Sequence, residues 1–197
     1  MLSCALETWS PGIGDPTIWG WLTVALYLVT AVSAFSASRA PFRLRPGVGR
    51  ERLFWGGIAV IMLFLAANKQ LDLQSFMTAY GRCTAVDQGW YEDRRSVQLI
   101  FIMTLLTWSA IAAFSLVVLL WGRLARLWPA ALGLVVVMGF VAIRAVGFHG
   151  TDALINLTIG GVPVNLFLEA IGPLLITSNA RAVRRTAVRT APLGVLE

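Results

Sequence analysis

The fold class is decided by the stretch at residues 96–121, SVQLIFIMTLLTWSAIAAFSLVVLLW, in which no residue is charged. An α-helix needs about 20 mainly apolar residues to cross the roughly 30 Å hydrocarbon core of a bilayer. The stretch is long enough for this and carries only a few polar side chains. It therefore predicts a transmembrane helix.

The composition of the whole chain agrees with a membrane environment. Of its 197 residues, 57% are apolar and 13% are charged, and the mean hydropathy is +0.74. Soluble domains carry roughly 25% charged residues, so we expect lipid to surround most of this chain. Because no segment has the composition of a soluble domain, we predict a single membrane domain over residues 1–197.

Four further apolar segments bring the expected number of spans to about five. We place the spans at residues 17–37, 53–70, 96–121, 128–148 and 163–177, with the second and fifth rather short. Tryptophans stand at span ends, as in the aromatic belts of membrane interfaces: Trp19, Trp21, Trp55, Trp121 and Trp128. The predicted fold class is all-α, a polytopic transmembrane helix bundle.

The arginines predict the orientation of this bundle. They follow the first span, the third span and the fifth span, which places them on one side: Arg39, Arg43, Arg45, Arg50, Arg52, Arg123, Arg126, Arg181, Arg184, Arg185 and Arg189. Since Lys and Arg concentrate in cytoplasmic loops, we expect the N-terminus outside and the C-terminus inside. We read this charge as a sign of topology, not of nucleic-acid binding. In the alternative, residues 163–177 lie in the interface, and a four-span bundle has its arginine-rich tail outside.

The remaining polar residues gather at the outer ends of the spans. Ionisable groups at membrane depth cost roughly 2.5–3.5 kcal/mol each and usually face the bundle interior in pairs. We therefore expect one cluster from four helices, in which Arg144 and Glu169 lie at similar depth. Its members are Asn68, Lys69, Asp72, Arg82, Arg94, Arg95, Gln98, Arg144, His149, Asp152, Asn165 and Glu169. If the second helix continues, Asn68, Asp72 and Ser75 share a face.

This cluster has two interpretations. It either fixes helix register and packing only, or it forms a pocket for a metal ion, a lipid headgroup, a pigment or a quinone. His149 and Asp152, three residues apart, are candidate metal ligands on one helical face. With Asp72 or Glu169 they would make an oxygen-rich site that suits Ca, Mg or Mn better than Zn. Catalytic zinc usually needs two or three His or Cys ligands, and this chain has one His.

The two cysteines, Cys4 and Cys83, both fall on the predicted outer side. A disulfide is permitted outside the cytoplasm and would pin the N-terminal segment over the segment after the second span. The alternative is two unrelated thiols.

A short signature lies between the second and third spans. Asn68-Lys69-Gln70-Leu71-Asp72-Leu73-Gln74, followed by Gly89-Trp90-Tyr91 and Arg94-Arg95, resembles a pattern in uncharacterised bacterial inner-membrane proteins. Arg144, His149, Asp152, Asn165 and Glu169 fit the same pattern. The resemblance implies a multi-pass protein of the bacterial inner membrane in which these residues are grouped, and it implies no activity.

The functional hypothesis follows from the lack of a catalytic motif and from the apolar helices. We expect a non-enzymatic integral subunit of a larger inner-membrane assembly, packed against other membrane subunits; a respiratory or photosynthetic complex would be one such assembly. The alternative is a small membrane enzyme, or a ligand- or metal-binding protein, that uses the outer polar cluster. Its cofactor would be a metal ion, a lipid or a pigment.

Overall fold

A computed structural model of the chain describes residues 2–9, 12–40, 48–90, 92, 94–146, 158–159 and 161–189. The helices in these ranges are α1 (Leu2–Thr8), α2 (Ile18–Ser38), α3 (Val48–Leu71), α4 (Leu73–Asp87), α5 (Arg94–Leu119), α6 (Leu124–Val146) and α8 (Val164–Arg189). A short antiparallel hairpin, β1 (Thr158–Ile159) and β2 (Val162–Pro163), precedes α8. Five helices, α2, α3, α5, α6 and α8, are long and apolar enough to cross a membrane. The predictions of an all-α fold and of about five helices with the length and composition of membrane spans are therefore confirmed.

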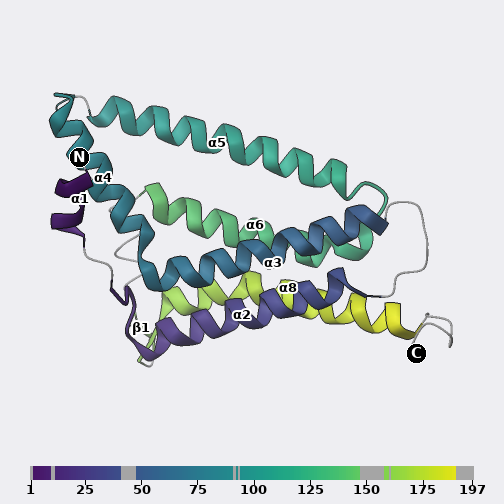
Figure 1. Cartoon of the computed structure of the whole chain (residues 1–197). Helices are drawn as coiled ribbons and strands as arrows, with labels where there is room; N and C mark the ends of the chain where they lie inside the picture. Colours follow the sequence, from purple (N-terminus) through teal and green to yellow (C-terminus); the bar gives the residue numbers. More distant parts are fainter. Residues whose placement is uncertain are drawn as a thin grey trace.

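The five long helices lie lengthwise beside one another and alternate in direction along the chain (Figure 1). We call the end where α1 and α4 lie the α4 end, and the end with the turn between α5 and α6 the turn end. α8 runs along the bundle with α2 and α6, and it does not lie across the bundle end as an interfacial helix would. α8 therefore lies in the same way as the other four helices that have the length and composition of membrane spans.

Three span boundaries differ by four or more residues from the sequence-based prediction. α3 begins at Val48 and not at residue 53. α6 begins at Leu124 and contains Pro129, although the Trp-Pro pair had suggested a helix start at residue 128. The earlier start is anchored by backbone hydrogen bonds that residues 126 and 127 donate to the Arg123 carbonyl. α8 runs to Arg189, beyond the expected end at 177, because its last turns are amphipathic: Ala180 and Val183 are buried, and the arginines between and after them are exposed.

The core lies between α2, α3, α6 and α8. Its largest fully buried side chains include Trp55, Met62 and Ile176. Small residues allow close helix contacts elsewhere, as is usual in membranes; a buried run on α2 is Ala31, Ala34 and Ala37. A buried hydrogen bond of 3.0 Å joins the hydroxyl groups of Thr30 on α2 and Thr177 on α8.

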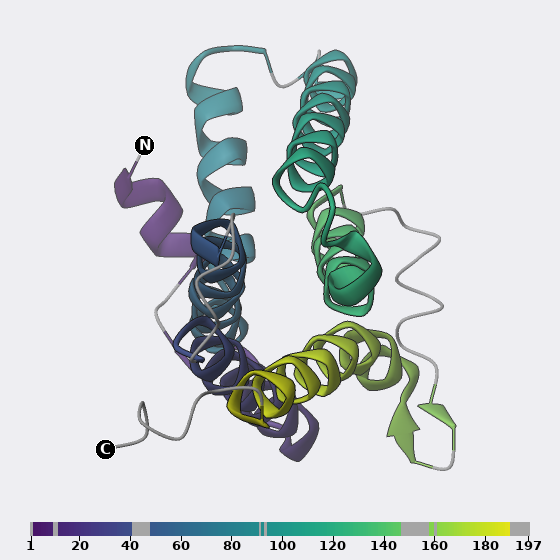
Figure 2. The same ribbon diagram turned by 90° about the vertical axis from the view of Figure 1, so that its right-hand side faces the viewer.

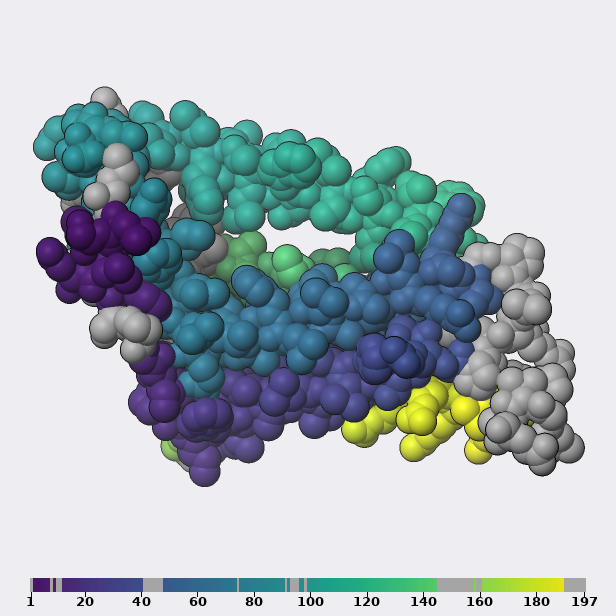
Figure 3. All heavy atoms as spheres, viewed as in Figure 1, coloured from purple at the N-terminus to yellow at the C-terminus, as the bar shows by residue number. Residues whose placement is uncertain are grey.

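The helix α5 stands apart from this core. None of its described side chains is buried, and it packs against the core only near its C-terminal end, through Leu116 and Leu119. Viewed along the bundle, α4 and α5 rise from the layer of the other helices (Figure 2). The space-filling view shows an open gap between α5 and α3 along most of their length (Figure 3).

The chain leaves the bundle at the junction of α3 and α4. Asp72 adopts a left-handed backbone conformation with φ of 47°, and this ends α3 and turns the chain into α4. The predicted continuous face of Asn68, Asp72 and Ser75 is therefore wrong, because the helix is interrupted at its middle member. An isolated left-handed residue costs little when it is Asp or Asn, but sequence periodicity does not reveal it.

The N-terminal segment packs against the junction of α3 and α4 and is linked to it by three contacts. Cys4 of α1 and Cys83 of α4 form a disulfide with Cα atoms 6.2 Å apart. The ring of Trp9 meets the edge of Phe76 with centroids 4.9 Å apart. The Gly14 N–H donates a 2.6 Å hydrogen bond to the carbonyl at residue 70. We call residues 2–9 and 12–15 the N-terminal strap, since these contacts tie α4 to the start of α2.

Candidate functional site

The centre of the polar cluster is a buried ion pair between α3 and α8. Lys69 Nζ lies 3.1 Å from Oε2 and 3.4 Å from Oε1 of Glu169, and it donates to both oxygens. The two side chains are only 10% and 5% exposed. Removing one partner of such a pair leaves an uncompensated buried charge, which costs far more than the pair contributes as a whole. Each residue therefore offsets the free-energy cost of burying the charge of the other.

Arg144 of α6 is the second cation near Glu169. Its Nη1 lies 3.9 Å from Glu169 Oε1, and its side chain is 39% exposed. The structure thus places Arg144 and Glu169 side by side, as their depth in the sequence suggested, but Lys69 is the closer partner. The three side chains surround a cavity of about 60 Å³, which holds only a few water molecules. Its lining residues are Tyr27, Leu65, Asn68, Lys69, Asp72, Phe140, Val141, Arg144 and Glu169.

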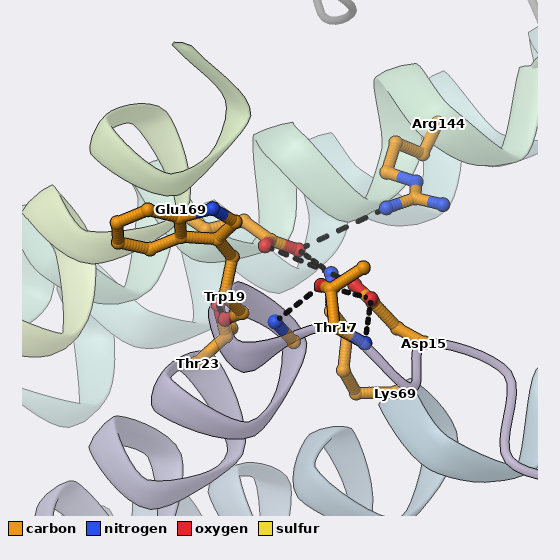
Figure 4. Close-up of polar contacts among 8 residues, drawn as sticks. Asp15, Thr17, Trp19, Thr23, Lys69, Arg144 and Glu169 are labelled. Carbon is orange, nitrogen blue, oxygen red and sulfur yellow. Dashed lines mark hydrogen bonds and ion pairs between the residues drawn. The ribbon is translucent and has the colours of Figure 1, made fainter. Parts of the chain in front are cut away.

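A second carboxylate, Asp15, reaches Lys69 from the N-terminal strap. Asp15 Oδ2 lies 3.4 Å from Lys69 Nζ, and Oδ1 accepts a 2.6 Å hydrogen bond from the Thr17 hydroxyl (Figure 4). Burial raises the pKa of Asp15, but the hydrogen bonds from Thr17 and the charge of Lys69 lower the pKa more, so it lies below its ordinary value. Asp15 was not among the predicted cluster residues, because it precedes the first span and has no helical periodicity.

The start of α2 is shaped to receive Asp15. Thr17 caps the helix, and its hydroxyl accepts a 3.1 Å hydrogen bond from the Gly20 N–H. A Cβ atom at Gly20 would collide with both the side chain and the backbone of Asp15. The glycine therefore lets the carboxylate lie against the first turn of α2 while it faces Lys69.

A larger cavity of about 360 Å³ lies on the other side of the ion pair. We call it the Asn165 cavity, and its lining residues are Asp15, Thr17, Trp19, Thr23, Lys69, Thr158, Gly161, Pro163, Asn165, Leu166 and Glu169. The buried Oδ1 atom of Asn165 has no hydrogen-bond partner in the described part of the chain. This volume lies within the range of roughly 300–1,000 Å³ that is usual for small-molecule sites.

The predicted cluster is only partly assembled here. The structure brings together Asn68, Lys69, Asp72, Arg144, Asn165 and Glu169 around the two cavities. Arg82 instead lies on α4, beside a separate cavity of about 550 Å³ next to the disulfide. The backbone at Arg94, Arg95 and Gln98 forms the start of α5, beyond the far end of α4 (Figure 1).

The predicted metal ligands, His149 and Asp152, lie outside the described residues, so this site stays a prediction. Within the described ranges, no group of three or more His, Cys, Asp or Glu side chains is close enough to hold a metal ion.

A second ionic cluster, at the turn end, was missed by the sequence analysis. Glu51 of α3 pairs with both Arg123 and Arg126, which flank the start of α6. Its side chain is 3% exposed, and Asn179 of α8 donates a 3.0 Å hydrogen bond to the Arg126 carbonyl. In the sequence, Glu51 is the one acid among the arginines of residues 39–52, and those arginines indicate topology without naming a partner.

Chemically, the two cavities beside the ion pair are lined by three carboxylates, an ammonium group, a guanidinium group and two side-chain amides, partly shielded from solvent. Such a set suits recognition of a polar or charged group by hydrogen bonds. Comparison with family models, with curated proteins and with solved structures gave no match to this chain.

Proposed function

We propose that the protein is a non-enzymatic integral subunit of a larger membrane assembly and that α5 contacts the partner. The observation that carries this proposal is the separation of α5 from its own bundle. Its exposed side chains include Ile100 at 67%, Trp108 at 66% and Phe114 at 72%. The partner that fits this surface is an apolar transmembrane helix of a different protein.

Exposure of apolar side chains is not sufficient evidence in a membrane, because lipid tails are as apolar as leucine. What holds transmembrane helices together is close packing of their side chains. α5 makes such packing only near its C-terminal end, and the gap beside α3 is open along most of the helix (Figure 3). A partner helix in this gap would provide the contacts that α5 does not find within its own chain.

The way in which α4 and the N-terminal strap hold the start of α5 suggests that the gap between α5 and α3 exists before a partner binds. α4 connects α3 to α5, and the N-terminal strap ties α4 through the disulfide and the aromatic pair Trp9 and Phe76. A covalent link of this kind restrains α4, and through it the start of α5. A partner would then bind a surface that is already held open, at a lower cost in ordering.

We also propose that the α4 end faces outward in a bacterial inner membrane. The arginines of the turn end, such as Arg123 and Arg126, support a cytoplasmic position for that end. The disulfide between Cys4 and Cys83 supports the same orientation independently, since it lies at the opposite end and disulfides persist outside the cytoplasm. A reporter that is active only in the cytoplasm, fused to the C-terminus, tests this orientation. We expect an active fusion, and an inactive one would indicate the opposite orientation.

A second candidate function is ligand binding, or catalysis, at the polar cluster of the α4 end. The Asn165 cavity favours ligand binding, because it is large enough for a small molecule and adjoins the buried ion pair. This function predicts that His149→Ala, or Glu169→Gln at a temperature at which this variant is still folded, abolishes activity.

The experiment for the leading proposal is native mass spectrometry after gentle detergent extraction. We expect a stable complex that contains at least one different polypeptide, and its absorption spectrum will show whether the assembly is a respiratory or photosynthetic one. The double variant Trp108→Ala, Phe114→Ala on α5 should lose this complex. Phe35→Ala, which removes an aromatic side chain 49% exposed on α2, is the control on a helix that does not border this gap and should keep it. Recovery of the wild type only as a monomer or homo-oligomer contradicts the proposal.

A further inference from the structure

We propose that exposed arginines at the turn end bind the phosphate group of an anionic phospholipid. These are Arg39 of α2 and Arg181 and Arg185 of α8, and we call them the arginine rim. The inference does not depend on α5, on a protein partner or on which side of the membrane the turn end faces. It rests on where the rim lies along two exposed helix faces and on the charges at that end.

The outer face of α8 changes from apolar to basic along one line. Its exposed residues recur every three or four positions, which places them on one side of the helix: Phe167, Ile171, Leu174, Ser178, Arg181 and Arg185. α2 and α6 pack against α8, and Ala180 and Val183 belong to the buried core, so the exposed line points away from the bundle. In a bilayer its apolar part faces hydrocarbon chains, and its two arginines face the headgroups beyond them.

α2 changes from apolar to basic at the same level. Its exposed Phe35 is followed one turn later by Arg39, whose guanidinium lies over the Phe35 ring, 4.6 Å from the centroid. The hydrogen bond between Thr30 and Thr177 joins two residues at one level, and both helices run in the same direction (Figure 1). Counted from this bond, Arg39 and Arg185 lie nine and eight residues further on. At about 1.5 Å per residue, the two arginines are nearly level.

The positive charge of the turn end exceeds the negative charge there. Among the described residues, the one acidic side chain at this end is Glu51, and it pairs with Arg123 and Arg126. The rim arginines make no ion pair with other described residues. Four further exposed arginines of this end likewise have none within the described ranges: Arg50, Arg52, Arg184 and Arg189. The segments that follow α2 and α8 add two arginines and one acid in the sequence, so the excess remains.

The chemistry of the rim suits a phosphate that carries a net negative charge. A guanidinium group stays ionised and offers a fork of N–H donors that matches two phosphate oxygens. Arg181 and Arg185 are four residues apart on one helix, a spacing at which like charges oppose each other. An anion bound beside both arginines offsets this repulsion. A zwitterionic headgroup brings its own cation with the phosphate, so it compensates the arginines less than an anionic headgroup does.

The order of this end distinguishes a binding site from a signal for orientation alone. Orientation requires only positive charge near the end of a span, in any conformation. Here α8 instead stays helical to Arg189, with Ala180, Val183 and Ala187 buried along its inner side. The backbone of the rim arginines on α8 is therefore held at a fixed level before a headgroup binds, which lowers the cost of ordering on binding.

The test measures which lipid the protein retains. The purified full-length protein is mixed with equal amounts of phosphatidylglycerol and phosphatidylcholine of identical acyl chains, and native mass spectrometry measures the bound lipid. We expect about a tenfold preference for phosphatidylglycerol, and equal binding of the two lipids overturns the proposal. A second mixture adds a short single-stranded RNA to the phosphatidylglycerol complex, which we expect to persist. Displacement of the lipid by the RNA would assign the arginines to nucleic acid and overturn the proposal as well.

Three variants connect this preference to the rim. The double variant Arg181→Gln, Arg185→Gln should lose most of the preference, and Arg39→Gln should weaken it. The lipid-free double variant should keep the melting temperature of the wild type, because both side chains are exposed. Arg82→Gln is the matched control, since it removes the same charge from an exposed arginine of α4 at the opposite end. Full preference in the double variant, or a loss in Arg82→Gln as large as in Arg39→Gln, contradicts the proposal.

Discussion

Lys69 and Glu169 are 100 residues apart in the sequence, yet the Lys69 Nζ atom lies 3.1 Å from Glu169 Oε2 inside the bundle. This ion pair joins the last turn of α3 to the early turns of α8, two helices that belong to the same core. It also lies between the two cavities that adjoin it, since both residues line both of them. The pair is thus both a packing element and part of the candidate site.

Breaking this ion pair from one side should destabilise the protein strongly. We expect Lys69→Met or Glu169→Gln alone to lower the free energy of unfolding by up to about 3–5 kcal/mol, because each removes the closer partner of a buried charge. The remaining charge keeps only its more distant partner, Arg144 for Glu169 and Asp15 for Lys69. The double variant should cost clearly less than the sum of the two. Unfolding in mixed micelles measures all four proteins, and strictly additive losses would show that the two side chains do not depend on each other.

The crossing of α6 and α8 should not tolerate a methyl group. A Cβ atom at Gly133 would lie 2.6 Å from the Gly172 carbonyl oxygen, and one at Gly172 would lie 2.7 Å from the Gly133 carbonyl oxygen. We expect Gly133→Ala to cost about 1–3 kcal/mol of stability, since the two backbones must separate. Gly139→Ala on the same helix meets nothing within 4 Å and serves as the control. Equal stability of the two variants contradicts this crossing.

The disulfide should stabilise the N-terminal strap and, through it, α4. It closes a loop with a sequence separation of 79 residues, for which chain entropy predicts about 4 kcal/mol of stabilisation. Cys4→Ser, Cys83→Ser and the double variant should therefore lose similar amounts of stability. A reducing agent should bring the wild type to the same level. Alkylation of two free thiols in the unreduced wild type would contradict the link.

Acid should weaken the contact of Asp15 with α2 and Lys69. Folding lowers the pKa of this carboxyl below 3.8, its ordinary value, so the folded state favours the ionised form. The stabilisation is complete above pH 3.8 and is lost as the pH falls through the lowered pKa. We expect Asp15→Asn to flatten the pH dependence of the melting temperature on the acid side of this value. Glu7→Gln, at an exposed carboxylate on α1, should leave the dependence largely unchanged.

The five spans could be predicted because apolar length is a local property of the sequence. The depth of Arg144 and Glu169 within their apolar segments was visible for the same reason, and the structure places the two side chains 3.9 Å apart. The sequence does not show that Lys69 is the closer partner of Glu169, because this depends on the distance between α3 and α8 in the folded bundle. Local sequence patterns show the position of a residue along the bundle axis, but they do not show which residues of other helices it contacts.

Three other features depend on tertiary contacts that no local pattern encodes. Asp15 reaches the site only because the N-terminal strap folds back along the α3–α4 junction. The turn at Asp72 rests on one left-handed residue. The separation of α5 from the bundle is invisible in its sequence, since an apolar helix reads the same whether it faces lipid, its own bundle or a partner.

The most direct test of the proposed function is photo-crosslinking in intact cells from a reactive amino acid at position 114 of α5. Phe114 is 72% exposed and lies on the helix that the bundle leaves uncovered. The same probe at Val32, 65% exposed on α2, is the control for collisions with passing proteins. The account predicts a discrete product that joins position 114 to one different membrane protein, with no such product from position 32. Crosslinks from position 114 only to lipid, or at the same low level from both positions, would contradict it.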